Sequence, residues 1–171
     1  MDGADCAAGR RAALARLALA PVAVLVLAAA GSQRPGETLA LPSIDDLRLL
    51  TAQMRREGIP LLLFFSTAGC PFCIEVRRNY LAPRLKESAG ALLIREVEIV
   101  GRRRFTGVDG KPQSEAEFAS GFGVHMVPAV QLVDANLAPL GKPLVGIDAS
   151  GFYDAYLTAA IEEAQRAMKA R

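Results

Sequence analysis

Residues 61–73 read LLLFFSTAGCPFC, and this stretch decides the predicted fold. Its first five residues, 61–65, form a short apolar run that follows Pro60 and precedes a polar turn. An apolar run of this length between breakers is typical of a buried strand. A helix is expected to start at the two cysteines and to run to about Ser88, with an interruption at Pro83. The stretch therefore predicts a strand that leads directly into a helix at a pair of cysteines.

Cys70 and Cys73 are separated by Pro71 and Phe72 at this junction. A thiol attacks only as its thiolate, and the unpaired N–H groups at a helix N-terminus stabilise negative charge. We therefore expect Cys70, the earlier and more exposed cysteine, to be the nucleophile. Cys73 lies one turn further along the helix, where it can attack the mixed disulfide and release the partner. Pro71 is tolerated in the first turn because its missing N–H would have no helical partner there.

A structural role and a metal-binding role, with zinc or copper, remain as alternatives for the cysteine pair. A structural disulfide across four residues would close a loop too small to add much stability. A zinc site would lack ligands, since the chain has three cysteines and one histidine. A copper site with Met126 as a soft third ligand is also an alternative. The spacing, and its place after a strand, favour redox chemistry over both.

Length and composition limit the classes of protein to consider. The chain has 171 residues, of which 51% are hydrophobic and 22% charged, so a disordered or fibrous protein is excluded. Twenty Lys and Arg against eighteen Asp and Glu give a formal charge of +2 at pH 7. Nucleic-acid-binding domains are usually more basic. We therefore expect no nucleic-acid partner.

The first 30 residues differ in character from the rest. Three arginines precede an uncharged apolar run over residues 17–30, which ends in three alanines. This is the pattern of a secretory signal, and the run is shorter than the roughly 20 apolar residues of a spanning helix. An uncleaved amino-terminal anchor and a buried helix are the alternatives. The predicted organisation is a signal peptide over 1–30, a linker over 31–42 and a domain over 43–171.

Export changes the interpretation of the cysteines. Cys6 lies in the segment that is removed or left in the cytoplasm, so the mature part keeps Cys70 and Cys73. Disulfides persist outside the cytoplasm. We therefore expect a periplasmic protein whose two remaining cysteines can pair.

Three further helices are predicted. The first begins at Ser43 as N-cap, with Asp45 and Asp46 in its first turn. A short helix begins at a capping box of Ser114 and Glu117. The last begins after residues 150–151, and its expected core face is made of Phe152, Tyr156, Ala160, Ile161 and Ala164.

Three further strands are predicted over residues 91–100, 129–133 and 139–145, the last of them an antiparallel edge strand. Residues 101–113 are expected to form a polar loop with a turn at Asp109 and Gly110. Three consecutive arginines in this loop, 102–104, are interpreted as a solvated surface, with docking of an acidic partner as the alternative.

A second motif, Val127-Pro128, stands directly before the strand predicted over residues 129–133. Together with the Cys70–Cys73 motif it resembles the thioredoxin superfamily, and the resemblance extends over about residues 43–168. It implies a thioredoxin-like α/β fold, with a central mixed β-sheet flanked by helices and a cis-proline loop against the cysteines. By this resemblance the backbone of Val127 pairs with an extended substrate segment. The implied substrate-binding residues are Pro71, Phe72, Val127 and Pro128.

The chain departs from cytoplasmic thioredoxins at several positions. Gly69 stands where they have tryptophan, and Phe64 where they have a buried aspartate that assists proton transfer. The Pro-Phe dipeptide between the cysteines resembles that of glutaredoxins and of some exported disulfide oxidoreductases. The predicted signal and the long spacing to Pro128 do not fit a glutaredoxin. The layout looks most like small exported thioredoxin-like proteins of bacteria, including those linked to sulfur oxidation.

The resemblance implies a thiol-disulfide oxidoreductase that acts on protein thiols or disulfides as a monomer. No bound cofactor is implied, because the dithiol is itself the redox group, and a membrane redox partner is expected to reset it. Phe72 offers no hydrogen bond or charge to a thiolate, which favours the reductase direction slightly. The alternatives are a non-catalytic binding or chaperone-like module of the same fold, and a copper-delivery protein.

Other residues near the motifs have weaker assignments. His125 should lie near the rim of the site, either as a plain surface residue or as a group that tunes the Cys70 thiolate with pH. Phe72, Ala68 and Met126 are a candidate apolar contact face, although Phe72 would equally serve in packing. Tyr80 and the face of Phe152 and Tyr156 are predicted to be core.

Overall fold

The computed structural model describes residues 40–88, 90–148 and 150–170. The predicted signal peptide and most of the predicted linker lie outside this part of the chain, as does Cys6. In the part described, no helix is both long and apolar enough to cross a membrane.

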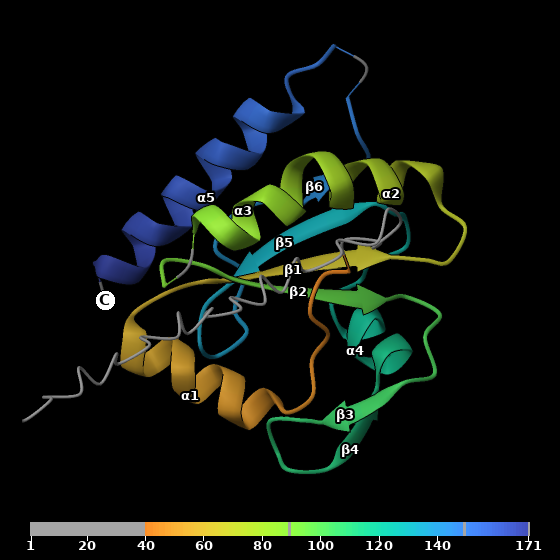
Figure 1. Ribbon diagram of the computed structural model, residues 1–171. Coiled ribbons are helices and arrows are strands. Elements are labelled where there is room, and N and C mark those ends of the chain that lie inside the picture. The colour runs from red at the N-terminus through yellow and green to blue at the C-terminus, as the bar shows by residue number, and fades with distance from the viewer. Residues whose placement is uncertain (1–39, 89, 149, 171) are drawn as a thin grey trace, which may run out of the picture. The chain divides into compact units, whose positions relative to one another are not determined.

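A four-stranded mixed sheet lies at the centre of the domain, in the order β2-β1-β5-β6 (Figure 1). β1 runs parallel to β2 and antiparallel to β5, and β6 pairs antiparallel with β5. This confirms the predicted α/β class with a central mixed sheet flanked by helices. The strands are β1 (Leu61–Ser66), β2 (Leu93–Glu98), β5 (Ala129–Val133) and β6 (Leu144–Val145).

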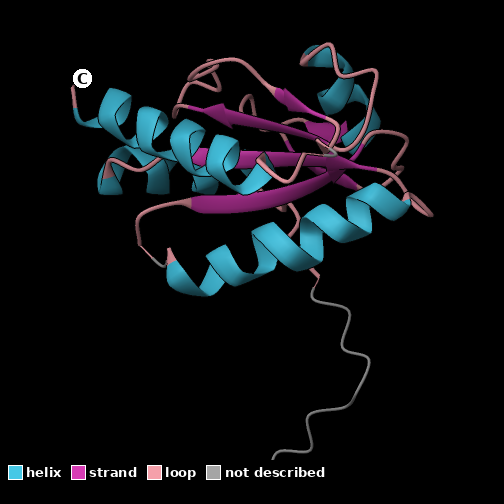
Figure 2. Ribbon diagram, turned by 90° about the horizontal axis from the view of Figure 1, so that it is seen from above, coloured by secondary structure: helices cyan, strands magenta, loops and turns pink. Residues whose placement is uncertain are grey.

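Helices cover both faces of the sheet, so β1 is buried along its whole length (Figures 1 and 2). Successive side chains of a strand point to opposite faces. Leu61, Leu63 and Phe65 therefore join one core cluster, and Leu62 and Phe64 join the other. The first cluster includes residues of α1 (Leu47–Glu57) and α4 (Glu115–Gly121). The second is covered by α2 (Pro71–Val76), η1 (Arg77–Leu81), α3 (Ala82–Glu87) and α5 (Tyr153–Lys169).

The helix that follows the cysteines is interrupted, as predicted, just before Pro83. η1 is a π-helical segment, in which the Ala82 N–H donates to the Arg77 carbonyl five residues back. Proline has no N–H to donate and its ring clashes with the carbonyl four residues earlier. The backbone widens there, and α3 then continues to Glu87.

The start of α1 differs from the prediction. The N-cap is Asp46, whose carboxylate accepts from the Arg48 N–H at 2.8 Å, and not Ser43. Ser43 instead forms a bridge with Glu96 of β2, and the Glu96 N–H donates to the Pro42 carbonyl at 2.9 Å. Pairing with the sheet edge keeps the chain extended until Asp46. The hydrogen bond from the Arg48 side chain lowers the pKa of Asp46 to about 2.

The prediction of a loop over residues 101–113 is wrong in part, because this segment contains an antiparallel hairpin. Its strands are β3 (Arg104–Thr106) and β4 (Pro112–Ser114). The expected turn is present: the Lys111 N–H donates to the Asp109 carboxylate at 3.0 Å, and Gly110 has a φ of 80°. Phe105 anchors the hairpin by packing edge-to-face on Phe118, at 5.4 Å between ring centroids. Each strand has only three residues, most of them polar, so the sequence shows no alternation of apolar and polar residues that would predict it.

Two other predictions need correction. The edge strand β6 covers only two residues of the predicted 139–145, and upstream of it Pro139 forms only an isolated antiparallel bridge with Val133. The core face of α5 consists of Tyr153, Leu157, Ile161 and Ala164, while Phe152 and Tyr156 are exposed. The predicted core assignment of Phe152 and Tyr156 is therefore wrong. Tyr80 is half-buried and packs on Tyr153, with 4.9 Å between ring centroids.

The capping box predicted for α4 is confirmed, and it provides a stability test. The Ser114 hydroxyl accepts from the Glu117 N–H at 3.2 Å, and the Glu117 carboxylate accepts from the Ser114 N–H at 2.7 Å. Ser114→Ala should therefore lower the free energy of unfolding by about 1 kcal/mol, measured by urea denaturation. Ser120→Ala, at an exposed position in the same helix, is the control and should change it by less than about 0.5 kcal/mol. Equal losses in the two variants would contradict the capping role.

Candidate active site

Cys70 and Cys73 lie where β1 passes through a tight turn into α2. Gly69 has a φ of 72°, a left-handed conformation that glycine adopts without steric cost. Cys70 is the N-cap of α2 and Pro71 is the first helical residue, as the sequence predicted. The two cysteines form a disulfide, with 5.2 Å between their Cα atoms.

The two sulfur atoms have different surroundings. Cys73 is fully buried within the core cluster that contains Phe64, whereas Cys70 is only partly buried. The Cys73 N–H donates to the Cys70 sulfur at 3.0 Å. A donor aimed at a sulfur from the first turn of a helix favours the thiolate when the disulfide is reduced. The accessible sulfur of Cys70 is therefore the one with the properties of a nucleophile, and Cys73 is the protected partner.

The Val127–Pro128 loop lies at the same end of the sheet as the cysteines (Figure 1). β5 pairs with β1 so that Ala129 lies opposite Phe65, which places Pro128 beside the end of β1. The Val127–Pro128 peptide bond is cis. The Pro128 carbonyl accepts from the Gly146 N–H at 2.7 Å, so this loop is tied to the segment after β6.

Several apolar side chains at or near these motifs are exposed. Phe72 is 57% exposed, so it does not serve in core packing, and Ala68 and Met126 are exposed as well. Ile74 is also exposed, and the sequence analysis missed it. Its position directly after the buried Cys73 on a helix was the available signal, because neighbouring helical residues point in different directions. His125 is exposed on the loop before Pro128.

Two carboxylates on β2, which the sequence analysis also missed, hold the turn that leads to Cys70. The Ser66 hydroxyl donates to Glu96 at 2.6 Å, and the Ala68 N–H donates to Glu98 at 3.1 Å. Arg77 forms an ion pair with Glu96, and hydrogen bonding to this carboxylate raises the pKa of Arg77. These contacts follow from the register of β1 on β2, which sets Ser66 opposite Glu98. The only sequence signal was the alternation of two glutamates along a predicted strand.

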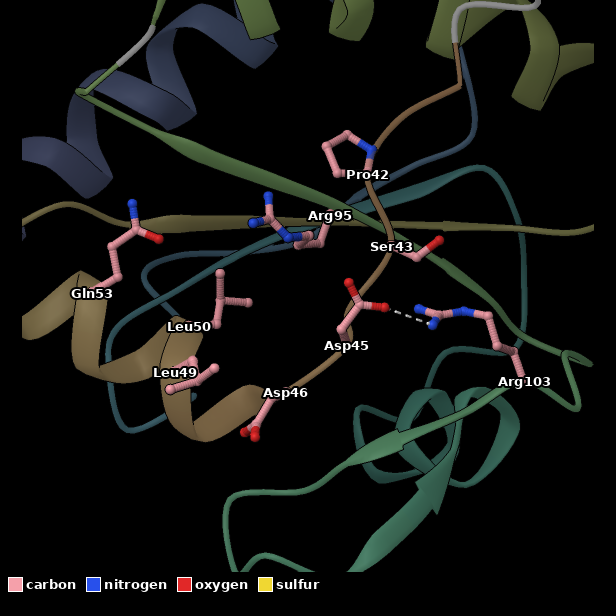
Figure 3. A pocket seen from close by; sticks show the side chains of 9 residues that line it. All are labelled: Pro42, Ser43, Asp45, Asp46, Leu49, Leu50, Gln53, Arg95 and Arg103. Atoms are coloured by element: carbon pink, nitrogen blue, oxygen red, sulfur yellow. Dashed lines mark hydrogen bonds and ion pairs between the residues drawn. The ribbon is translucent and has the colours of Figure 1, made fainter.

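Two of the pockets lie on the β2 side of the sheet. One of about 540 Å³, shown in Figure 3, lies between the start of α1 and β2, and no cysteine lines it. Arg103 pairs there with Asp45 at 3.1 Å, and burial lowers the pKa of Arg95. A second, of about 380 Å³, borders the Cys70 turn through Ser66, Thr67 and Ala68.

Arg103, one of the three arginines in the predicted loop, is held by acidic neighbours. Besides Asp45, it pairs with the buried Glu115 at 3.3 Å. Burial raises the pKa of Glu115, and the charge of Arg103 opposes this rise. Among the described residues, no three His, Cys, Asp or Glu side chains converge as metal ligands.

Comparison with known proteins identifies the family. The sequence model of a family described as a thioredoxin-like domain matches residues 48–161. No curated protein matches the chain. Among solved structures, a DsbH oxidoreductase is 20% identical with a TM-score of 0.51, and the match covers 73% of this chain and 88% of that one. At this identity the likeness concerns the fold alone.

Two further solved structures are similar at lower TM-scores. Thioredoxin from Trichomonas vaginalis is 19% identical with a TM-score of 0.47, and the match covers 74% of this chain and 97% of that one. A thioredoxin-fold protein from Helicobacter pylori is 18% identical with a TM-score of 0.48, and the match covers 66% of this chain and 81% of that one. The family match spans most of the domain, including both cysteines and the Val127–Pro128 loop. The chain therefore belongs to the thioredoxin-like domain family and has the thioredoxin-like fold, with the Cys70–Cys73 disulfide at the start of α2.

Proposed function

We propose that the protein is a thiol-disulfide oxidoreductase that acts on exported proteins through Cys70 and Cys73, with the reductase direction slightly favoured. The observation that carries this proposal is the asymmetry of the pair. A partly exposed sulfur accepts a helix N–H at 3.0 Å, and its partner three residues later is fully buried. A disulfide with only a structural role would not need this difference.

The proposed reaction consists of two exchanges. The Cys70 thiolate attacks one sulfur of a client disulfide, so that a Cys70–client bond forms and the other client sulfur leaves as a thiolate. Cys73 then loses its proton and attacks the Cys70 sulfur, which forms the Cys70–Cys73 disulfide and releases the second client thiolate. The client gains two electrons and, with two protons from solvent, becomes a dithiol. A dithiol donor, proposed to be a membrane redox protein, must then reduce the pair again.

Several features support the reductase direction of the reaction and a protein in unfolded or extended form as the client. Phe72 is exposed and contributes neither a charge nor a hydrogen bond that would favour an extreme oxidant. The exposed apolar side chains of Phe72 and Met126 suit contact with an unfolded or extended client. Pro71, Phe72, Val127 and Pro128 are the proposed client-binding residues. Export, and a periplasmic location, rest on the pattern of residues 1–30.

Trapping of the mixed disulfide tests this function. The full chain carrying Cys6→Ser and Cys73→Ser, reduced and mixed with insulin, should form a covalent adduct that dithiothreitol releases. The adduct should accumulate because the resolving thiol is absent. The matched control, which carries Cys70→Ser in addition, should form none. An adduct that forms equally in both proteins, or in neither, would contradict the proposal.

A further inference from the structure

The cavity of about 540 Å³ between α1 and β2 has no part in the proposed reaction, since no cysteine lines it. Its volume lies within the range of small-molecule sites in proteins, about 300–1,000 Å³. Its wall combines apolar and polar side chains, those of Pro42, Leu49, Leu50, Ser43, Gln53 and Arg95 among them. A mainly apolar wall with a few polar groups is the usual composition of a ligand site.

Arg95 is a half-buried cation with unused hydrogen-bond donors. A guanidinium has five N–H groups, and among the described residues only the Ile94 carbonyl accepts from Arg95, at 2.7 Å from Nη1. Burial lowers the pKa of Arg95, and the charge of Asp45 opposes this shift only in part. A charged group removed from water is costly unless it is paired and hydrogen-bonded. An anion in the cavity would supply both the missing charge and the missing acceptors.

The two acidic side chains of the wall are paired with other arginines. Asp46 pairs with Arg48 at 2.6 Å. Asp45 is turned toward Arg103 and pairs with it at 3.1 Å, whereas the Arg95 side chain extends toward α1 (Figure 3). In the part of the chain that the structure describes, Arg95 therefore has no carboxylate at ion-pair distance. The two aspartates also repel a doubly charged anion more strongly than a singly charged one.

The apolar part of the wall belongs to the same cavity as this cation. Leu49 is 71% exposed on α1, and Leu50 lines the cavity beside it. Contact with an apolar group would remove this leucine surface from water, which is favourable. The wall therefore suits a ligand with a singly charged anionic head and an apolar body.

We propose that this cavity binds a small organic carboxylate, whose carboxylate pairs with the Arg95 guanidinium and whose apolar body contacts Leu49 and Leu50. The bond to Ile94 uses Nη1 of Arg95, so the edge formed by Nε and Nη2 has no acceptor among the described residues. Two N–H groups on one edge of a guanidinium match the two oxygens of a carboxylate. The inference goes beyond the proposed oxidoreductase function and does not depend on it.

Titration of the isotope-labelled full chain, carrying Cys6→Ser, tests this site with hexanoate as the probe. Amide chemical shifts in nuclear magnetic resonance spectra are followed at slightly alkaline pH. Three further probes separate the parts of the ligand: 1-hexanol has the tail without the charge, acetate has the charge with little tail, and inorganic phosphate is mainly doubly charged. Hexanoate should saturably shift amides within residues 43–53 and 94–96. It should bind about tenfold more tightly than each of the other three probes.

Variants of the same chain separate the contact of the head from the contact of the tail. Arg95→Met should weaken hexanoate binding by about tenfold or more, and Arg95→Lys, which keeps the charge without the planar edge, should weaken it less. Leu49→Ala should weaken hexanoate binding by about twofold to fivefold and leave acetate binding within about twofold. The control is Arg56→Met, which removes an exposed arginine of α1 that pairs with Glu57 outside the cavity. It should leave hexanoate binding within about twofold of the parent protein.

Shifts that do not saturate would overturn the inference, as would equal affinities for hexanoate and 1-hexanol or equal binding by Arg95→Met and the parent protein. Phosphate that binds more tightly than hexanoate would overturn it too, because the cavity would then prefer a doubly charged ligand. If Arg95→Met fails to fold, as judged by circular dichroism, Arg95→Lys and Leu49→Ala decide the question together with the four probes. A parent protein that reduces insulin but does not bind hexanoate would contradict this inference alone.

Discussion

Replacing Cys70 by serine should reduce the rate of insulin-disulfide reduction by on the order of 10³-fold or more. Cys70 carries the accessible sulfur, and the Cys73 N–H is aimed at it at 3.0 Å. Serine keeps the N-cap geometry, but its hydroxyl is a poor nucleophile at neutral pH. The measurement is insulin turbidity with dithiothreitol as electron donor, in the full chain carrying Cys6→Ser.

The control is the parent protein with Cys6→Ser alone, which should keep the activity of the natural chain. Circular dichroism of the Cys70→Ser protein should show an unchanged fold, since Cys70 is not part of the buried core. Retained activity in Cys70→Ser would contradict the enzymatic account. It would favour the alternative of a binding module in which the cysteines are incidental.

Phe65→Ala should lower the free energy of unfolding by about 3–5 kcal/mol. Phe65 lies in the central strand β1, is fully buried, and packs on Phe122 with 5.6 Å between ring centroids. Removal of the ring loses its transfer free energy and leaves a cavity between β1 and α4, which close packing does not readily fill. Urea denaturation of the oxidised protein measures the loss.

Phe72→Ala is the matched control, because it removes the same ring from an exposed position. It should change the free energy of unfolding by less than about 0.5 kcal/mol, since Phe72 is exposed on the first turn of α2. Equal effects at the two positions would contradict the assignment of β1 as the centre of the core.

The central features of the fold could be predicted because they depend on local signals. A continuous apolar run ended by a turn marks β1, and the cysteines and Pro71 mark the start of α2. The Ser114 capping box marks α4 in the same way. Each of these signals lies within a few residues of the element it specifies, so no knowledge of the tertiary structure is needed.

The errors occurred where a distant contact decides the local structure. Ser43 is not an N-cap because pairing with Glu96, far away in the sequence, holds that segment extended. The core face of α5 includes the predicted Ile161 and Ala164, but its first half differs by one residue, since Tyr153 packs on Tyr80 and leaves Tyr156 exposed. A helix with apolar residues at neighbouring positions does not itself indicate which of them face the sheet.

The site could be predicted in part for the same reason. The cysteines and Pro128 are short motifs, whereas the connection from Ser66 through Glu96 to Arg77 requires three segments to meet. The register of two parallel strands brings them together, and a single sequence does not specify that register. Isolated glutamates on an edge strand look like ordinary solvated residues until the strand pairing is known.

The central claim is that Cys70 and Cys73 form a redox-active pair, and its reduction potential is the most direct test. The full chain carrying Cys6→Ser is equilibrated with mixtures of reduced and oxidised glutathione or dithiothreitol, and the free thiols are counted by alkylation and mass spectrometry. We expect reversible exchange with a midpoint closer to the value of about −270 mV typical of thioredoxin than to the value of about −120 mV of a strong disulfide-forming oxidant. A disulfide that stays unchanged across the whole range of mixtures would contradict it.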